Sequence, residues 1–147
     1  HPGDLDYIHS VERISKLSSV ISINGGVQLD LMGQENAEST GTRQLSGVGG
    51  QMDFLEGAYR SKGGKGFICI NSSRVTKDGE RKSNILATIP GGSTISAPRT
   101  MIQYVATEYG IASLSGKTLR ERAEAMASIA HPHFREELMK YARENFK

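Results

Sequence analysis

The sequence predicts an α/β domain in which a mixed β-sheet is layered with helices. Apolar residues recur with a period of two in short runs between residues 20 and 96, and with a helical period in the last third of the chain. Strands followed by helices, without an internal repeat, are typical of a sheet covered by helices. A length of 147 residues corresponds to about one domain and is sufficient to bury a core.

Short alternating runs are predicted as strands. Residues 20–24 and 27–32 alternate around Gly25-Gly26, which predicts a β-hairpin, and residues 33–36 are predicted as a polar turn. The charged segment 72–83 is predicted to be a solvated hairpin loop. Further strands are expected at 65–71, 85–89 and 94–96.

Helical patterns follow in the last third. Met101, Val105 and Tyr109 are spaced at i, i+4 and i+8, which predicts an amphipathic helix over 101–109. A capping box at 118–121 begins a second helix. Pro132 suits the first position of a third helix.

Charge and composition argue against several classes of protein. The formal net charge is only +2, without a clustered basic stripe, so we expect no nucleic-acid partner. No apolar run approaches the ~20 residues of a membrane span, and we expect a cytoplasmic protein that does not bind membranes. Cys69, the single cysteine, lies in an apolar run and is predicted to be a buried structural thiol. The opening residues 1–4 are neither an initiator methionine nor a signal peptide, which indicates an engineered product, a cleavage product or a fragment of something longer.

The stretch Gly47-Val48-Gly49-Gly50-Gln51 directly precedes a helical pattern over residues 54–59. A glycine-rich loop that opens a helix directs backbone N–H groups toward one spot. Such a spot suits a phosphate, a carboxylate or a developing oxyanion. A tight turn that only packs against the sheet explains the same local pattern, and the spacing alone leaves both interpretations open.

Other motifs fail at a necessary position. The dinucleotide-binding pattern that begins at Gly47 has Met52 in place of its third glycine. The Gly-Lys-Thr tripeptide at 116–118 lacks the earlier glycine of a phosphate-binding loop. His131 and His133 flank Pro132 without a nearby ligand cluster, so we interpret them as a polar helix entrance and expect no metal site.

Glu108 is the carboxylate that most invites a catalytic role, because it lies near the end of the predicted helix 101–109, beside two hydroxyl residues. The helix dipole disfavours an acidic side chain at that end, so we expect a cationic partner, either Arg99 or Arg122. We favour a structural ion pair over a catalytic role.

Several segments, taken together and in order, carry a family resemblance. They are Ser22-Ile23-Asn24, Asp30–Gln34, Ser46–Phe54, Gly63-Gly64-Lys65, Thr107–Gly110, Gly116-Lys117, Glu121-Arg122-Ala123 and Ile129–Arg135. This combination covers essentially the whole chain. It resembles the C-terminal part of the acetyl-CoA hydrolase/transferase family, nearest to its 4-hydroxybutyrate and butyryl-CoA:acetate CoA-transferase branch. The resemblance implies that residues 1–147 form the second, CoA-transferase-like domain of an enzyme of butyrate metabolism.

The resemblance also implies a reaction and a set of site residues. Members of this family move coenzyme A, a substrate and not a permanently bound cofactor, from an acyl-CoA to a short-chain carboxylate through a glutamyl-CoA thioester. By resemblance, Gly47–Gln51 forms the oxyanion loop, with Gly50 against the thioester end of CoA. Lys62 would contact the pantetheine or phosphate portion, and Asn24 and Gly26 would line the same cleft.

The nucleophilic glutamate of the family lies upstream of the matched region. Glu12, Glu35 and Glu38 lack its sequence context. We therefore expect this chain to supply about one third of the enzyme, to be inactive alone, and to need the N-terminal portion of the same enzyme as its partner, within a homo-oligomer. Acyl-CoA hydrolysis stays open as an alternative, because the choice of acceptor depends on water exclusion near the absent glutamate. A non-catalytic CoA-binding or assembly module is the second alternative.

Overall fold

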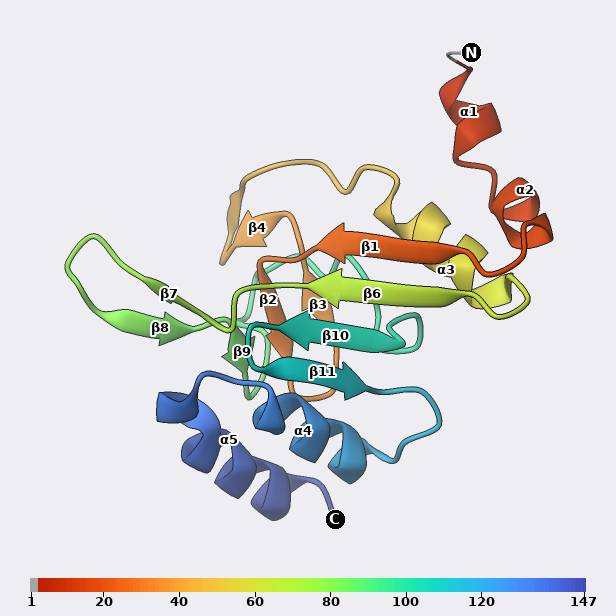
Figure 1. The fold of residues 1–147 in the computed structure, drawn as a ribbon. Coiled ribbons are helices and arrows are strands. Elements are labelled where there is room, and N and C mark those ends of the chain that lie inside the picture. Colours follow the sequence, from red (N-terminus) through yellow and green to blue (C-terminus); the bar gives the residue numbers. More distant parts are fainter. Residues whose placement is uncertain (1–2) are drawn as a thin grey trace.

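The computed structural model describes residues 3–147 (Figure 1). A four-stranded sheet has the order β1 (Ile21–Gly25), β6 (Lys65–Cys69), β10 (Tyr104–Thr107) and β11 (Gly110–Ser113). The first three strands are parallel, and β11 is antiparallel to β10. This sheet is mixed, as predicted.

A second, smaller sheet crosses behind the first in Figure 1. Its order is β3 (Glu35–Asn36), β2 (Gln28–Asp30) and β9 (Ile85–Leu86), with β2 antiparallel to β3 and parallel to β9. Two hairpins complete the strands. They are β4 (Ser39–Thr40) with β5 (Arg43–Gln44), and β7 (Ser73–Val75) with β8 (Arg81–Ser83). The β7–β8 hairpin occupies the segment predicted as a solvated hairpin loop.

Five helices accompany the sheets within residues 3–147. They are α1 (Leu5–Ile8), α2 (Val11–Lys16), α3 (Gln51–Arg60), α4 (Leu119–Ser128) and α5 (Pro132–Asn145). α3 packs on β1 and β6, whereas α4 packs on β11 and α5 (Figure 1). The predicted capping box is confirmed at α4, where Thr118 and Glu121 exchange hydrogen bonds, and Pro132 is the first residue of α5. None of the described helices is both long and apolar enough to cross a bilayer.

The predicted hairpin over 20–32 is wrong. β1 pairs with β6 in the four-stranded sheet, and β2 pairs with β3 and β9 in the other. Period-two alternation identifies a strand but does not identify its partner. Gly26 carries the chain from one sheet to the other, and its backbone N–H bonds to the carbonyl of Cys69 at 3.3 Å. The segment expected to be a polar turn at 33–36 contains β3, in which both residues are buried.

The predicted helix over 101–109 is also wrong, because this segment forms β10 and enters the turn to β11. Val105 is fully buried between partly exposed neighbours, which is the alternation of a strand. Pairing with β6 supplies hydrogen-bond partners for the backbone of this segment. Such tertiary pairing overrides the helical spacing of three apolar residues, Met101, Val105 and Tyr109. The short strand expected at 94–96 is not formed; only Ala97 makes an isolated bridge, to Glu35.

The core lies between the two sheets and the helices α3, α4 and α5. Its largest fully buried apolar side chains are Leu29, Leu31, Leu55, Ile68, Ile85, Ile102, Leu114, Met126 and Val105. Cys69 is not part of it: the predicted buried thiol is exposed, because Gly66 and Ile68 of β6 face the core and Cys69 faces the other way.

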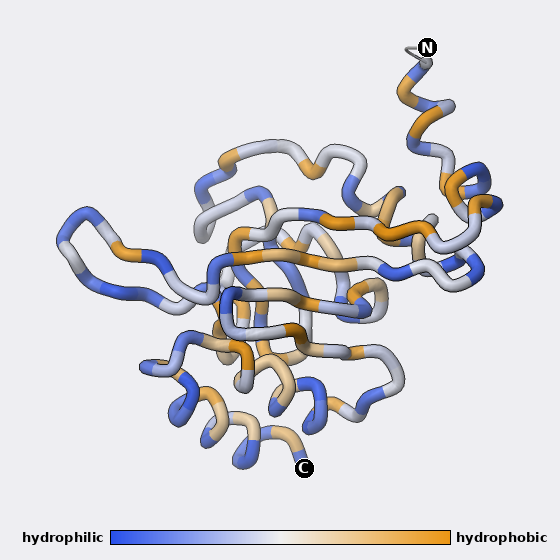
Figure 2. The backbone as a smooth tube through the Cα atoms, viewed as in Figure 1, coloured by the Kyte–Doolittle hydropathy of each residue, from blue (hydrophilic) through white to orange (hydrophobic). Residues whose placement is uncertain are grey.

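The opposite face of the four-stranded sheet is apolar and open. Ile21 and Ile23 on β1 are 52% and 69% exposed, and Ile111 on β11 is 63% exposed. The strand register places Phe67 and Tyr104 on the same face, where their rings stack with centroids 4.9 Å apart. Figure 2 shows hydrophobic stretches along β1 and β6 in this sheet. Monomeric proteins rarely leave such a continuous apolar surface in water.

Candidate functional site

The glycine loop leads directly into α3, as the sequence predicts. Gly47, Val48 and Gly49 are exposed, Gly49 adopts a positive φ of 61°, and Gly50 is the N-cap residue of α3. No side chain caps this helix start. The first N–H groups of a helix have no intrahelical acceptor, so this end of α3 is available to an anion.

His9 lies directly over Gly50. A Cβ atom at residue 50 would overlap the imidazole ring of His9, so any larger residue there requires His9 or the loop to move. The His9 Nδ1 atom is 3.5 Å from Asp53 Oδ2, and its ring packs edge-on against Phe54 with centroids 5.2 Å apart. This histidine is not among the predicted site residues, because nothing local to residue 9 indicates contact with a loop about 40 residues later.

Gln51, the first residue of α3, is held by Glu35. Its side-chain Nε2 donates a hydrogen bond to Glu35 Oε2. Glu35 is fully buried, and burial raises the pKa of its carboxyl to about 8 despite the opposing hydrogen bond from Gln51. In the sequence, Glu35 is only a poor match to the family nucleophile, and the polar tetrapeptide 33–36 gives no sign that this residue is buried in β3.

Gly26 meets the other oxygen of the same carboxyl. A Cβ atom at residue 26 would lie 2.8 Å from Glu35 Oε1 and 3.1 Å from the Cγ2 atom of Ile68. The structure therefore brings Gly26 and Gln51, two predicted site residues, to the two oxygens of one side chain. The start of α3 consequently lies near the carboxyl end of β1.

A hollow of about 430 Å³ lies beside Gly26, where β6 and β10 also end. Its lining comprises Gly26, Cys69, Ile70, Asn71, Ala106 and Thr107. Ligands of open α/β sheets bind outside the carboxyl ends of parallel strands, which is where this hollow lies. Asn24, one residue before the end of β1, is half-buried and donates from Nδ2 to Ser22 Oγ at 2.8 Å.

Lys62 is not brought close to the glycine loop. It is exposed in the connection between α3 and β6, beyond the C-terminus of a helix of 10 residues. At 1.5 Å per residue, the helix separates Lys62 from the loop by roughly 15 Å. Contact of one ligand with both therefore requires an elongated molecule.

Glu108 does not end a helix and does not pair with an arginine. It lies in the turn between β10 and β11 and accepts hydrogen bonds from Ser72 N at 2.9 Å and Ser72 Oγ at 2.6 Å. Partial burial would raise the pKa of Glu108, but the bonds from Ser72 outweigh it and hold the pKa below its usual value. The expectation of Arg99 or Arg122 as partner fails because it depended on a helix that does not form.

The two late histidines mark a helix entrance, as predicted. His131 is the N-cap residue of α5, and its Nδ1 accepts from the backbone N–H of His133 at 3.2 Å. Across the described part of the chain, no cluster of three or more His, Cys, Asp or Glu side chains is arranged to hold a metal ion.

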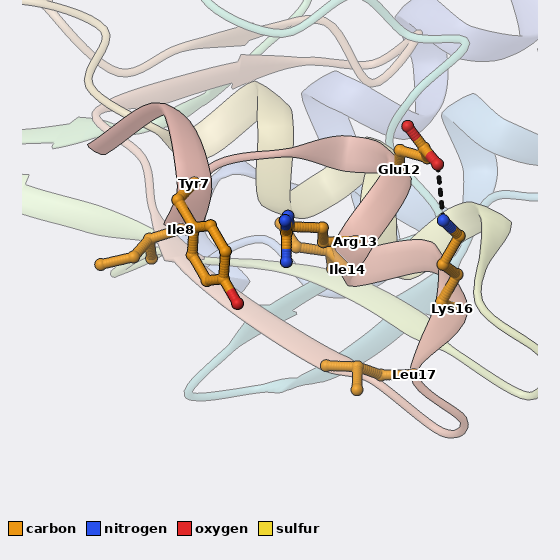
Figure 3. Close-up of a pocket in the computed structure, with 7 residues that line it drawn as sticks. All are labelled: Tyr7, Ile8, Glu12, Arg13, Ile14, Lys16 and Leu17. Carbon is orange, nitrogen blue, oxygen red and sulfur yellow. Dashed lines mark hydrogen bonds and ion pairs between the residues drawn. The ribbon is translucent and has the colours of Figure 1, made fainter. Parts of the chain in front are cut away.

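A separate hollow of about 630 Å³ lies against α1 and α2 (Figure 3). Lys16 pairs with Glu12 at 2.5 Å, and the guanidinium of Arg13 lies 3.6 Å from the ring centroid of Tyr7. The charged groups of this hollow are thus engaged with neighbours on the same two helices. It contains none of the predicted site residues.

Comparison with known proteins identifies the family of this domain. Residues 3–142 match the model of the acetyl-CoA hydrolase/transferase C-terminal domain. The chain is 46% identical over 138 residues to a butyryl-CoA:acetate CoA-transferase of Anaerostipes caccae, covering 94% of this chain and 31% of that protein. It is 47% identical over 142 residues to a 4-hydroxybutyrate coenzyme A transferase of Clostridium kluyveri, covering 97% of this chain and 32% of that protein.

A solved structure shows the same fold. RipA from Yersinia pestis superposes with a TM-score of 0.83 at 38% identity, over 95% of this chain and 30% of the RipA chain. The chain thus spans about a third of the length of the relatives that it matches. Because the family match covers nearly all of the residues, the chain belongs to the acetyl-CoA hydrolase/transferase family, as its C-terminal domain.

Proposed function

We propose that the enzyme containing this chain transfers coenzyme A between a short-chain acyl-CoA, of the butyryl or 4-hydroxybutyryl type, and a carboxylate such as acetate. The observation that carries this proposal is the uncapped start of α3 behind the exposed residues 47–49, near the carboxyl ends of the parallel strands. Two of the relatives bear names that describe this type of transfer.

The proposed contribution of this chain is stabilisation of an oxyanion. A glutamate carboxylate supplied by the rest of the enzyme attacks the thioester carbonyl, and the thiolate of CoA leaves as an acyl–glutamyl anhydride forms. The thiolate then attacks the glutamyl carbonyl, which releases the acyl group as a carboxylate and leaves a glutamyl-CoA thioester. Each attack places negative charge on a carbonyl oxygen, and fixed N–H donors at Gly49, Gly50 and Gln51 would stabilise that charge.

Coenzyme A is proposed as an elongated ligand that extends along this domain. Its thioester end would lie at Gly50, beside the hollow lined by Gly26, and Asn24 would approach it from the end of β1. Lys62, roughly 15 Å away along α3, would meet a distant phosphate or the pantetheine chain. A positively charged, exposed lysine suits that role.

The N-terminal portion of the same enzyme is the proposed partner. The open apolar face of the four-stranded sheet, formed by Ile21, Ile23, Phe67, Tyr104 and Ile111, supports this proposal. The relatives are about three times as long as this chain, so they contain enough additional residues to cover such a face. A homo-oligomer and a cytoplasmic location remain predictions.

The test is an assay of the full-length enzyme with butyryl-CoA, with and without acetate. Transfer predicts acetyl-CoA formation that requires acetate, and a hydroxylamine-sensitive CoA adduct on a glutamate when acyl-CoA is supplied alone. Release of free CoA at the same rate without acetate would instead establish hydrolysis. A protein that binds CoA but forms neither product nor adduct would establish a non-catalytic module.

A further inference from the structure

The buried carboxyl of Glu35 links two parts of the proposed site. Its Oε2 accepts from Gln51 Nε2 at the start of α3, and its Oε1 lies against Gly26 at the junction of β1 and β2. We propose that Glu35 is a positioning residue for the glycine loop, which it serves by holding Gln51 and so fixing the direction of the N–H groups at the start of α3. This inference rests on the proposed CoA transfer only for its effect on catalysis.

The backbone of Glu35 is rigidly held, so its side chain has a fixed base. Its N–H donates to the carbonyl of Ala97 at 3.0 Å, and its carbonyl accepts from Ser96 N at 2.8 Å. On its other side Glu35 pairs with Leu29 of β2. By contrast, α3 begins after an exposed glycine loop and has no side-chain cap. The Gln51–Glu35 bond therefore ties a weakly held helix start to a well-held strand.

The proton on Glu35 is part of this arrangement. Oε1 of Glu35 is buried and has no hydrogen-bond partner among the residues described. A Cβ atom placed on Gly26 would meet this oxygen together with the Cγ2 methyl groups of Ile68 and Ile70, so its surroundings are apolar. Burial is the largest cause of the raised pKa of about 8, so the carboxyl is mostly neutral at pH 7.

Among the described residues, no neighbouring charge contributes to the raised pKa of Glu35. Asp30 on β2 accepts from the backbone and side chain of Gln34, and Asp53 on α3 faces His9. Glu38 follows β3 and shows no bond to Gln51. Ionisation of Glu35 would therefore leave a charge without a compensating cation, and movement of the carboxylate toward water would displace Gln51 and Gly26.

Hydrogen exchange and kinetics on the full-length enzyme test the inference. The variants are Glu35→Gln, which keeps an oxygen acceptor but cannot ionise, and Glu35→Met, which removes the acceptor. Glu38→Gln is the matched control, because it neutralises a buried glutamate three residues away. Amide exchange is measured by mass spectrometry in peptides covering residues 46–60, at about pH 6.5 and about pH 9, and kcat and KM are measured over the same range.

In Glu35→Met, we expect faster exchange in these peptides at both pH values and a kcat lowered about tenfold or more, because small displacements of oriented groups are costly to rate. KM should change less than kcat. The wild-type enzyme should lose loop protection and kcat above about pH 8, whereas Glu35→Gln should keep both. Glu38→Gln should follow the wild type.

The inference would be overturned if the peptides covering residues 46–60 exchanged at the wild-type rate in Glu35→Met. It would also be overturned if loop protection and kcat declined above pH 8 in Glu35→Gln as they do in the wild type. If Glu35→Met does not fold, Gln51→Met removes the same hydrogen bond at its other end. Gln51 is only half-buried, so this change disturbs the core less, and it should cause the same faster exchange. If the Glu35→Met peptides exchange faster but the wild-type enzyme transfers no CoA, then Glu35 holds Gln51 and the proposed function is rejected. Failure of the inference and failure of the proposed function are therefore distinguishable.

Discussion

Arg122 Nε on α4 donates a 2.8 Å hydrogen bond to the backbone carbonyl of Met32, which lies 90 residues earlier in the chain. Its Nη1 and Nη2 donate to the carbonyls of Leu114 and Arg99, also at 2.8 Å. The side chain is nearly buried, and this burial, together with the charge of Arg99, lowers the pKa of Arg122. One guanidinium thus joins α4 to three separate loops through carbonyl dipoles, without a carboxylate.

Replacing this arginine should destabilise the domain strongly. Arg122→Met leaves three carbonyls without their donor, and we expect a loss of about 3 kcal/mol or more. Arg120→Met on the same helix is the matched control, because Arg120 is exposed and only pairs with Glu124. That change should cost at most about 0.5 kcal/mol. Equal thermal unfolding midpoints for the two variants would contradict the structural role of Arg122.

The Ser72–Glu108 contact should make the turn between β10 and β11 sensitive to acid. The folded-state pKa of Glu108 is lowered, so its contribution is present above the unfolded pKa of about 4.5 and is lost as the pH falls through the folded value. Ser72→Ala should cost about 1 kcal/mol at neutral pH, and less once Glu108 is protonated. Ser128→Ala, which removes an exposed hydroxyl, is the control. A Ser72→Ala effect that grows on acidification would refute this account.

Glu35 should give the opposite dependence on pH. Its folded-state pKa of about 8 is above the unfolded value of 4.5, so its stabilising contribution is complete below pH 4.5 and is lost as the pH rises to about 8. Relative to the wild type, Glu35→Gln should therefore gain thermal stability between pH 5 and 9. Thermal scans at closely spaced pH values measure the difference. A constant difference across that range would show that Glu35 does not titrate there.

Gly50→Ala should displace either the glycine loop or the segment that carries His9. The added Cβ overlaps the His9 imidazole, so we expect a fall in CoA-transfer rate of about tenfold or more. The double variant Gly50→Ala with His9→Ala removes the overlapping ring and should recover much of the rate. Gly91→Ala is the control, because a Cβ there meets nothing within 4 Å. Failure of the double variant to recover would exclude the steric explanation.

Ile23→Asp should weaken attachment of this domain to the rest of the enzyme. Ile23 is 69% exposed here, so an aspartate costs the isolated domain little, whereas an aspartate buried under the N-terminal portion would remain unpaired. Val75→Asp on the β7 hairpin is the control, since Val75 is 57% exposed and lies outside this face. Limited proteolysis and activity of the full-length enzyme should change only for Ile23→Asp. Equal behaviour of the two variants would mean that the face stays open.

Local sequence rules predicted the elements whose signals are local. The capping box of α4, the proline that begins α5 and the glycine loop before α3 each depend on side chains within a few residues of one another. Strand pairing and the segment 101–109 were predicted wrongly because they depend on contacts between residues far apart in the sequence. The partner of β1 is 44 residues away, at Lys65 opposite Ile21, and no short pattern specifies such a distance.

The amino-acid sequence by itself determined the class of fold, the family and the loop that opens α3, because these follow from periodicity, capping chemistry and the order of motifs. Only the tertiary structure decided that Glu35 lies between Gly26 and Gln51, that Arg122 binds carbonyls and that one face of the sheet is open. Each of these depends on burial and on contacts between distant segments. The free energy of a buried charge or an exposed isoleucine is set by its surroundings, which local sequence does not specify.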